Sequence, residues 1–252
     1  MGIEFYVDSN MAVSWSWAVA AFILTLGCAI QTAVGFGMAV IAAPIIMLVK
    51  PEWVPYTLTS TALLLSLINA WHQRAYLNFS MILPAVISRI PGTVVGAWLL
   101  VSISLAWLHL VVAICVLAGV LVSLSNVRFD ATPSRMSVAG FFSGFMGTTT
   151  SIGGPPMALV LQHADPKTVR ANLGFYFAYA CVISMLSYAI AGLLTREVLI
   201  ACVSFFPSAI LGFLLGKGLH AWVDKKHFRK IILLLCGIAS LIALIGAVSA
   251  FI

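Results

Sequence analysis

The residues best suited to chemistry form a short polar segment inside the apolar residues 138–161. This segment contains four hydroxyl side chains and two glycines, followed by two prolines: Thr148, Thr149, Thr150, Ser151, Gly153, Gly154, Pro155 and Pro156. Proline removes a backbone donor, and glycine costs about 1 kcal/mol relative to alanine, so no continuous helix runs through the segment. Hydroxyls and the N–H groups at such a break favour anion binding. The pattern therefore predicts a broken membrane helix with an anion site at the break.

A second break is predicted in the first half of the chain. The apolar residues 15–49 would make a helix of roughly 52 Å, whereas the hydrocarbon core of a bilayer is ~30 Å thick. This run must therefore break or fold back, and Gly35 and Gly37 mark the place. Gln31 precedes this break and Gln162 follows the other one. We predict that these four residues also line the anion site, through backbone groups and side-chain amides.

Arg89 is the cation expected to supply charge to that site. It lies within the apolar residues 80–101, whereas every other Lys and Arg lies in or beside a loop. An arginine at membrane depth is costly and is usually functional. Every Asp and Glu lies near the end of an apolar run, so an anionic substrate is the expected partner. The alternative is that Arg89 extends to the membrane interface or binds backbone carbonyls.

The composition identifies the class of protein. Hydrophobic residues make up 62% of the 252 residues and charged residues only 8%, and the mean hydropathy is +1.12. A soluble domain has about 25% charged residues. Long unbroken apolar runs exclude a transmembrane barrel, so we predict an all-α polytopic membrane protein. The net charge of +6 lies in short loops, as the positive-inside rule expects, and predicts no nucleic-acid partner.

No catalytic residue, metal ligand or cofactor site is predicted. The sequence contains no nucleophile–base constellation, phosphate-binding loop or H-E-x-x-H motif. The five cysteines have no C-x-x-C spacing and are interpreted as small core residues: Cys28, Cys115, Cys181, Cys202 and Cys236. The chain is therefore not expected to be an enzyme.

The order of apolar runs repeats after a polar linker. We predict an outside tail at residues 1–13, a first transmembrane repeat at 14–126, a cytoplasmic linker at 127–135 and a second repeat at 136–252. The segment Pro91-Gly92 with Gly96 corresponds to Pro207-Ser208 with Gly212. Such duplication is typical of transporters. The spacings Gly92-x-x-x-Gly96 and Gly212-x-x-x-Gly216 also predict close helix packing.

The loop charges distinguish two topologies. If each broken run crosses the membrane once, Lys and Arg are divided between both faces. If each run folds back as a hairpin, only Lys50 and Arg196 lie opposite the other loop cations, which obeys the positive-inside rule better. The hairpin model gives two inverted repeats, about eight spanning helices plus two broken or re-entrant hairpins, and eight to ten membrane segments. Both termini then lie outside.

The two breaks and the Pro-Gly segment resemble those of a known family. Val34-Gly35-Phe36-Gly37 with Pro44, Pro91-Gly92 with Gly96, and Ser151-Ile152-Gly153-Gly154-Pro155-Pro156 resemble the TauE/SafE sulfite exporter family. The resemblance covers about residues 14–250. It implies transport of sulfur-containing anions, such as sulfite, sulfoacetate or other organosulfonates, across the inner membrane.

These observations predict an exporter of small sulfur anions that works by alternating access. The anion would lie at mid-membrane between the two breaks. The expected partners are this anion and the lipid bilayer, and the sequence does not decide whether the protein is a homodimer. Two alternatives are a non-transporting membrane subunit and an intramembrane enzyme.

Overall fold

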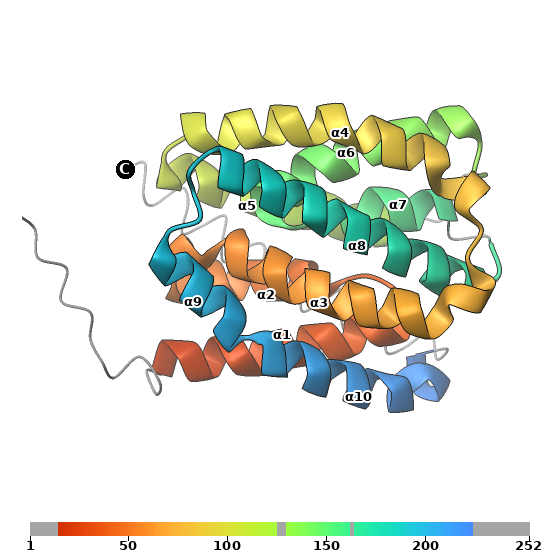
Figure 1. The fold of residues 1–252 in the computed structure, drawn as a ribbon, viewed down its shortest axis with the longest axis horizontal. Coiled ribbons are helices and arrows are strands. Elements are labelled where there is room, and N and C mark those ends of the chain that lie inside the picture. The colour runs from red at the N-terminus through yellow and green to blue at the C-terminus, as the bar shows by residue number, and fades with distance from the viewer. Residues whose placement is uncertain (1–14, 125–129, 162–163, 224–252) are drawn as a thin grey trace, which may run out of the picture.

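The computed structural model of the chain describes residues 15–124, 130–161 and 164–223, and all of its regular elements are helices. Most of them lie roughly parallel to one long axis, so that the helices form a bundle (Figure 1). The first half contains α1 (Trp15–Val34), α2 (Met38–Val49), α3 (Tyr56–Gln73), α4 (Phe79–Ser102) and α5 (Leu105–Leu124), with the short turns η2 (Pro51–Trp53) and η3 (Arg74–Tyr76). The second contains α6 (Pro133–Thr150), α7 (Gly154–Leu161), α8 (Pro166–Ile190), α9 (Arg196–Ser204) and α10 (Phe206–Val223).

Local sequence signals explain where several helices begin. The four capping residues each accept a hydrogen bond from a backbone N–H in the first turn: Asn78 for α4, Thr132 for α6, Asp165 for α8 and Thr195 for α9. This side-chain acceptor satisfies one of the N–H groups that have no partner within the helix. In α6 and α8 a proline follows the cap, where its missing N–H costs nothing.

Both predicted breaks occur, and each broken run folds back on itself. Trp17 at the start of α1 and Trp53 after α2 both contact the ring of Phe205, at centroid distances of 5.8 Å and 5.3 Å. In the second run, Val160 near the end of α7 and Arg135 near the start of α6 line the same surface groove. Both ends of each run therefore meet, as the hairpin model predicts and the single-crossing model does not.

The Gly-x-x-x-Gly segments mediate close helix packing, and this confirms the interpretation made from their spacing. A Cβ atom at Gly92 of α4 would lie 2.1 Å from the carbonyl oxygen of Phe141 in α6. A Cβ atom at Gly212 of α10 would lie 2.7 Å from the carbonyl oxygen of Thr25 in α1. The helix pairs α4–α6 and α1–α10 are therefore in backbone contact, which only glycine permits.

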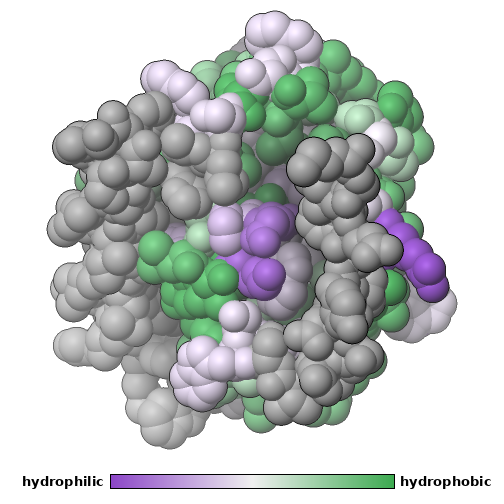
Figure 2. Space-filling view, turned by 90° about the vertical axis from the view of Figure 1, so that its left-hand side faces the viewer, coloured by the Kyte–Doolittle hydropathy of each residue, from purple (hydrophilic) through white to green (hydrophobic). Residues whose placement is uncertain are grey.

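The exterior of the bundle is hydrophobic, as a lipid environment requires. Exposed large side chains include Trp15, Phe22, Trp71, Ile87 and Trp98. Four helical segments of the described residues are long and apolar enough to cross a membrane: Trp15–Val34, Phe79–Ser102, Pro166–Ile190 and Arg196–Leu219. Figure 2 shows one end of the bundle, where hydrophilic residues gather near the centre and hydrophobic residues lie around them.

The apolar run predicted at residues 198–219 falls within the segment Arg196–Leu219, in which α9 and α10 follow one another with only Phe205 between them. Pro207 has no N–H to donate to the carbonyl of Val203, so the helix is interrupted between them. The cysteine interpretation holds for Cys28, Cys115, Cys181 and Cys202, which are free and buried. Cys236, the tail at 1–13 and the predicted last run at 231–252 lie outside the described residues.

Replacing Gly92 with alanine tests the contact between α4 and α6. The methyl group would overlap the Phe141 carbonyl, so we expect destabilisation of about 1–3 kcal/mol, seen as a lower melting temperature of the detergent-purified protein. Gly218→Ala in α10 is the control, since nothing lies within 4 Å of its added Cβ. Equal melting temperatures for the two variants would contradict backbone contact at Gly92.

Candidate functional site

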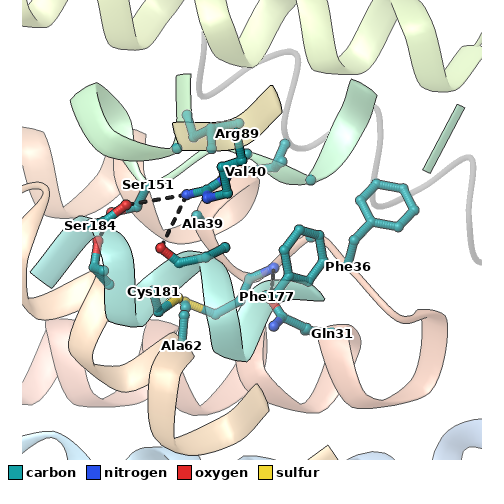
Figure 3. A pocket seen from close by; sticks show the side chains of 18 residues that line it. Gln31, Phe36, Ala39, Val40, Ala62, Arg89, Ser151, Phe177, Cys181 and Ser184 are labelled. Atoms are coloured by element: carbon teal, nitrogen blue, oxygen red, sulfur yellow. Dashed lines mark hydrogen bonds between the residues drawn. The ribbon is translucent and has the colours of Figure 1, made fainter. Parts of the chain in front are cut away.

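The two breaks line one cavity of the bundle. Phe36 and Gly37 belong to the first break, Ser151 and Gly153 to the second, and Arg89 of α4 also lines the cavity (Figure 3). The cavity volume of about 40 Å³ is enough for about three water-sized groups. Segments far apart in the sequence therefore meet around a space suited to a compact ligand.

Arg89 is the most buried charge of this site, with 2% of its surface exposed. Its Nη1 donates to the carbonyl and hydroxyl oxygens of Ser143, at 2.8 Å and 3.1 Å. Its Nη2 donates to the carbonyl of Ala180 at 3.3 Å and to Oγ of Ser184 at 3.2 Å. Its Nε is buried and has no hydrogen-bond partner. Carbonyl binding, one alternative from the sequence, is thus observed, while extension to the interface is not.

The acceptors around Arg89 bond to its Nη1 and Nη2 atoms but carry no net charge. The described carboxylates are all exposed, and none forms an ion pair with Arg89. They are Glu52, Asp130, Asp165 and Glu197. A buried cation without a counter-ion is costly in a low-dielectric interior. The part of the chain that the structure describes therefore leaves a positive potential at the cavity, where an anion would be stabilised.

The first break presents backbone donors. Gly37 has a φ of 118°, a left-handed conformation that favours glycine, and it caps the N-terminus of α2. The Met38 N–H donates to Oε1 of Gln31 at 3.4 Å. Ala39 and Val40 follow in the first turn and line the cavity, and N–H groups of a first turn have no acceptor within the helix. The positive end of α2 therefore faces the cavity.

At the second break, the hydroxyl of Ser151 and the backbone of Gly153 line the cavity. Ser151, with φ 63°, forms hydrogen bonds with the Thr59 hydroxyl at 2.7 Å and the Pro55 carbonyl at 2.8 Å. Gly153 accepts a hydrogen bond from Ser143 at 2.6 Å, and a Cβ atom there would lie 2.8 Å from the Ser143 carbonyl. Because Pro155 and Pro156 follow Gly154, the first turn of α7 has fewer N–H donors than that of α2.

The structure brings together part of the predicted set. Six predicted residues line the cavity: Gln31, Gly37, Arg89, Ser151, Gly153 and Gly154. The hydroxyls of Thr149 and Thr150 bond to carbonyls of their own helix, and that of Thr148 bonds to Thr93 and Ser184. Gly35 lines a neighbouring smaller cavity instead. Gln162 lies outside the described residues.

Several residues of the site were not predicted from the sequence. Ser184 and Cys181 of α8 and Thr59 of α3 line the cavity, and Ser143 of α6 links Arg89 to Gly153. Serine and threonine within apolar helices are common, so their type alone carried no signal. The one available signal was helical spacing, because Ala180, Cys181 and Ser184 lie on one face of α8.

The described residues contain no group of three or more His, Cys, Asp or Glu side chains that could hold a metal ion. The lining of the cavity is largely apolar, and its polar groups include a guanidinium, hydroxyls and backbone N–H groups. Charged and hydrogen-bonding donors of this kind recognise oxyanions.

Comparison with known proteins gives one match. The model of a family described as "Sulfite exporter TauE/SafE" matches residues 19–243, which is most of the chain. No curated protein and no solved structure matches significantly.

Replacing Ser143 with alanine tests the link between Arg89 and the second break. The change removes the donor to the Gly153 carbonyl and one acceptor of Arg89, and leaving such buried groups unsatisfied costs about 1–3 kcal/mol. We expect the melting temperature in detergent to fall accordingly. Ser187→Ala is the control, since its hydroxyl donates only to Ser184 O of its own helix. A Ser143→Ala variant as stable as this control would refute the link.

Proposed function

The chain belongs to the sulfite exporter TauE/SafE family of membrane transporters, and from this premise we propose that it exports small sulfur oxyanions across the inner membrane. One observation carries the proposal: the buried charge of Arg89 has no carboxylate partner among the described residues and lines a cavity formed by both breaks. The anion would bind beside Arg89, the Ser151 hydroxyl and the first turn of α2. Gly37, Gly153 and Gly154 would let it approach the backbone.

The cavity volume supports sulfite over larger organosulfonates in this conformation. About 40 Å³ accommodates about three water-sized groups, close to the size of one sulfur with three oxygens. Sulfoacetate carries an additional carboxymethyl group and would require the cavity to widen. Phe36 and Phe177 line the cavity and would have to move for this.

We further propose that the two halves are inverted repeats. Gly35 and Ser151 both have positive φ values, and each donates its N–H to the carbonyl four residues earlier, at 2.7 Å and 3.0 Å. The Thr32 hydroxyl pairs with Asn69 of α3, just as the Thr148 hydroxyl pairs with Ser184 of α8. Corresponding residues of the two halves thus make corresponding contacts.

The packing of the glycine segments supports one register for the proposed repeat. Gly92 contacts Phe141 and Gly96 contacts Phe145 of α6, while Gly212 contacts Thr25 of α1 and Gly216 contacts Ala29. In this register Gly92 corresponds to Gly212. The sequence motifs instead suggest that Gly96 corresponds to Gly212, and the two alignments differ by about one helical turn. In the register that the packing supports, Arg89 corresponds to the fully buried Ala209. The second half therefore carries no equivalent charge.

The arrangement of loops supports the proposed topology. Figure 1 shows that α9 begins at one end of the bundle, whereas α3 ends and α8 begins at the opposite end. Arg196 is the first residue of α9, while Arg74 directly follows α3 and Lys167 is the second residue of α8. By the positive-inside rule the second end is cytoplasmic. The α1–α2 hairpin then enters from outside and the α6–α7 hairpin from the cytoplasm. Residues 14–126 and 136–252 would form the two repeats, and eight to ten membrane segments and alternating access follow from this proposal.

Arg89→Gln tests the proposed site. The variant keeps hydrogen-bonding groups but removes the charge, so we expect sulfite flux in proteoliposomes to fall about 10- to 100-fold, the value of one or two charge-assisted hydrogen bonds. Arg196→Gln, at an exposed position near the opposite surface, is the control and should transport normally. Unchanged flux in a folded Arg89→Gln protein would remove Arg89 from the site.

The voltage dependence of flux tests the mode of transport. Because no described carboxylate lines the cavity, we expect anion export to be driven by the membrane potential, which contributes about 2.3 kcal/mol per 100 mV for each charge. Sulfite efflux from proteoliposomes should rise when the interior is made negative with a potassium gradient and valinomycin. Efflux that follows an imposed pH gradient and ignores voltage would contradict this expectation.

A further inference from the structure

A second polar cavity lies beside the first break, on the far side from Arg89. It is lined by residues of three helices: Gln31 and Gly35 of the first broken run, Ser66, Asn69 and Gln73 of α3, and Arg170 of α8. Its volume is about 10 Å³, which is close to the minimum for one water molecule. Gln31 lines both this cavity and the larger one, so it lies next to both spaces.

Two polar atoms of this cavity have no partner. The Nε atom of Arg170 and the Oδ1 atom of Asn69 are buried without a hydrogen bond, and only 6% of Asn69 is exposed. The Asn69 Nδ2 donates to the Thr32 hydroxyl at 3.3 Å. Buried polar atoms are nearly always hydrogen-bonded in native proteins. Unpartnered atoms on two different helices, a donor at Arg170 and an acceptor at Asn69, therefore indicate that this cavity is built to hold a polar ligand that accepts one hydrogen bond and donates another, such as a protonated oxyanion.

The charge of the cavity selects an anion. Arg170 is the one charged side chain among its lining residues, and it forms no ion pair within the described ranges. The guanidinium fork binds oxyanions more specifically than an ammonium group does. Gln73 and Ser66 add an amide and a hydroxyl, which also donate to oxyanions.

The backbone at Gly35 keeps this space open. Its φ of 102° is a conformation that side chains rarely adopt, and a Cβ atom there would lie 3.2 Å from Leu173 and 3.5 Å from Cγ of Arg170. The added Cβ would crowd Leu173 and make ordinary van der Waals contact with the stem of Arg170. The first break and Arg170 are therefore direct neighbours.

The position of the cavity suggests its role. Gln73 is the last residue of α3, and Arg170 lies in the second turn of α8, so both are near the end of the bundle proposed to be cytoplasmic. Both side chains are half-buried, as expected at the mouth of a cavity. An anion arriving from that end would reach Arg170 first and Gln31 next. The Arg89 cavity follows beyond Gln31.

We propose that the cavity around Arg170 is a loading subsite, which takes a small oxyanion from the cytoplasm and passes it by Gln31 to the Arg89 cavity. This inference rests on the proposed transport function and deepens it. The present volume admits one water-sized group, and displacement of the half-buried Arg170 and Gln73 side chains opens it for the anion. Arg170 then acts on capture of the substrate rather than on its final binding.

The test measures sulfite flux from the cytoplasmic face of oriented proteoliposomes over a range of sulfite concentrations. Arg170→Gln should raise the half-saturating concentration about 10-fold, the lower end of what electrostatic steering provides, and leave the saturating flux within about twofold of wild type. Gln73→Glu, which adds an opposing charge at the mouth, should raise it as well. Arg74→Gln is the matched control, because Arg74 is exposed at the same end and does not line the cavity.

Each outcome decides the inference. A selective rise with Arg170→Gln and Gln73→Glu, with Arg74→Gln unchanged, supports the loading subsite. Equal effects of Arg170→Gln and Arg74→Gln would show that only the general surface potential matters and would overturn it, as would a lower saturating flux at an unchanged half-saturating concentration. If Arg170→Gln does not fold, Gln73→Glu alone decides. A wild-type protein without sulfite flux would refute the transport proposal itself, and the loading subsite with it.

Discussion

A buried guanidinium without a described counter-ion is the constraint on which the rest of the structure depends. Arg89 can remain at 2% exposure only because Ser143, Ala180 and Ser184 supply oxygens from two helices. This requires α4, α6 and α8 to approach one another closely, and Gly144 allows it, since a Cβ atom there would lie 2.5 Å from the Arg89 carbonyl. The close packing of α4, α6 and α8, the backbone breaks and the buried charge of Arg89 therefore depend on one another.

The sequence was most informative where covalent chemistry restricts the backbone. Pro155 and Pro156 and the excessive length of residues 15–49 predicted both breaks, and the loop charges favoured the hairpins that the structure contains. Arg89 was identified because a charge in an apolar run is rare. In each case the residue type or the length of the run is unusual for a membrane helix, so the inference did not depend on tertiary context.

The sequence was least informative about hydroxyl groups. Thr149 and Ser151 are close neighbours of similar chemistry, yet the first bonds to its own helix and the second faces the cavity. The difference arises because α6 ends at Thr150 and Ser151 adopts a left-handed conformation. Arg170 escaped notice for a related reason, since beside a loop it resembled an ordinary topogenic charge. Contacts between distant segments decided these roles, and residue spacing does not report them.

The correspondence of Arg89 with Ala209 has a consequence for the transport cycle. If the proposed inverted halves exchange conformations, the inward-open and outward-open forms of a fully symmetric carrier would be related by a two-fold axis and would have equal affinities. In the proposed carrier the one arginine would stay with α4 while the surrounding helices exchange roles, so the two forms would hold the anion in unequal electrostatic environments. Such a carrier would transport the anion faster in one direction than in the other at concentrations that saturate one face but not the other. The equilibrium distribution of the anion across the membrane would be unchanged.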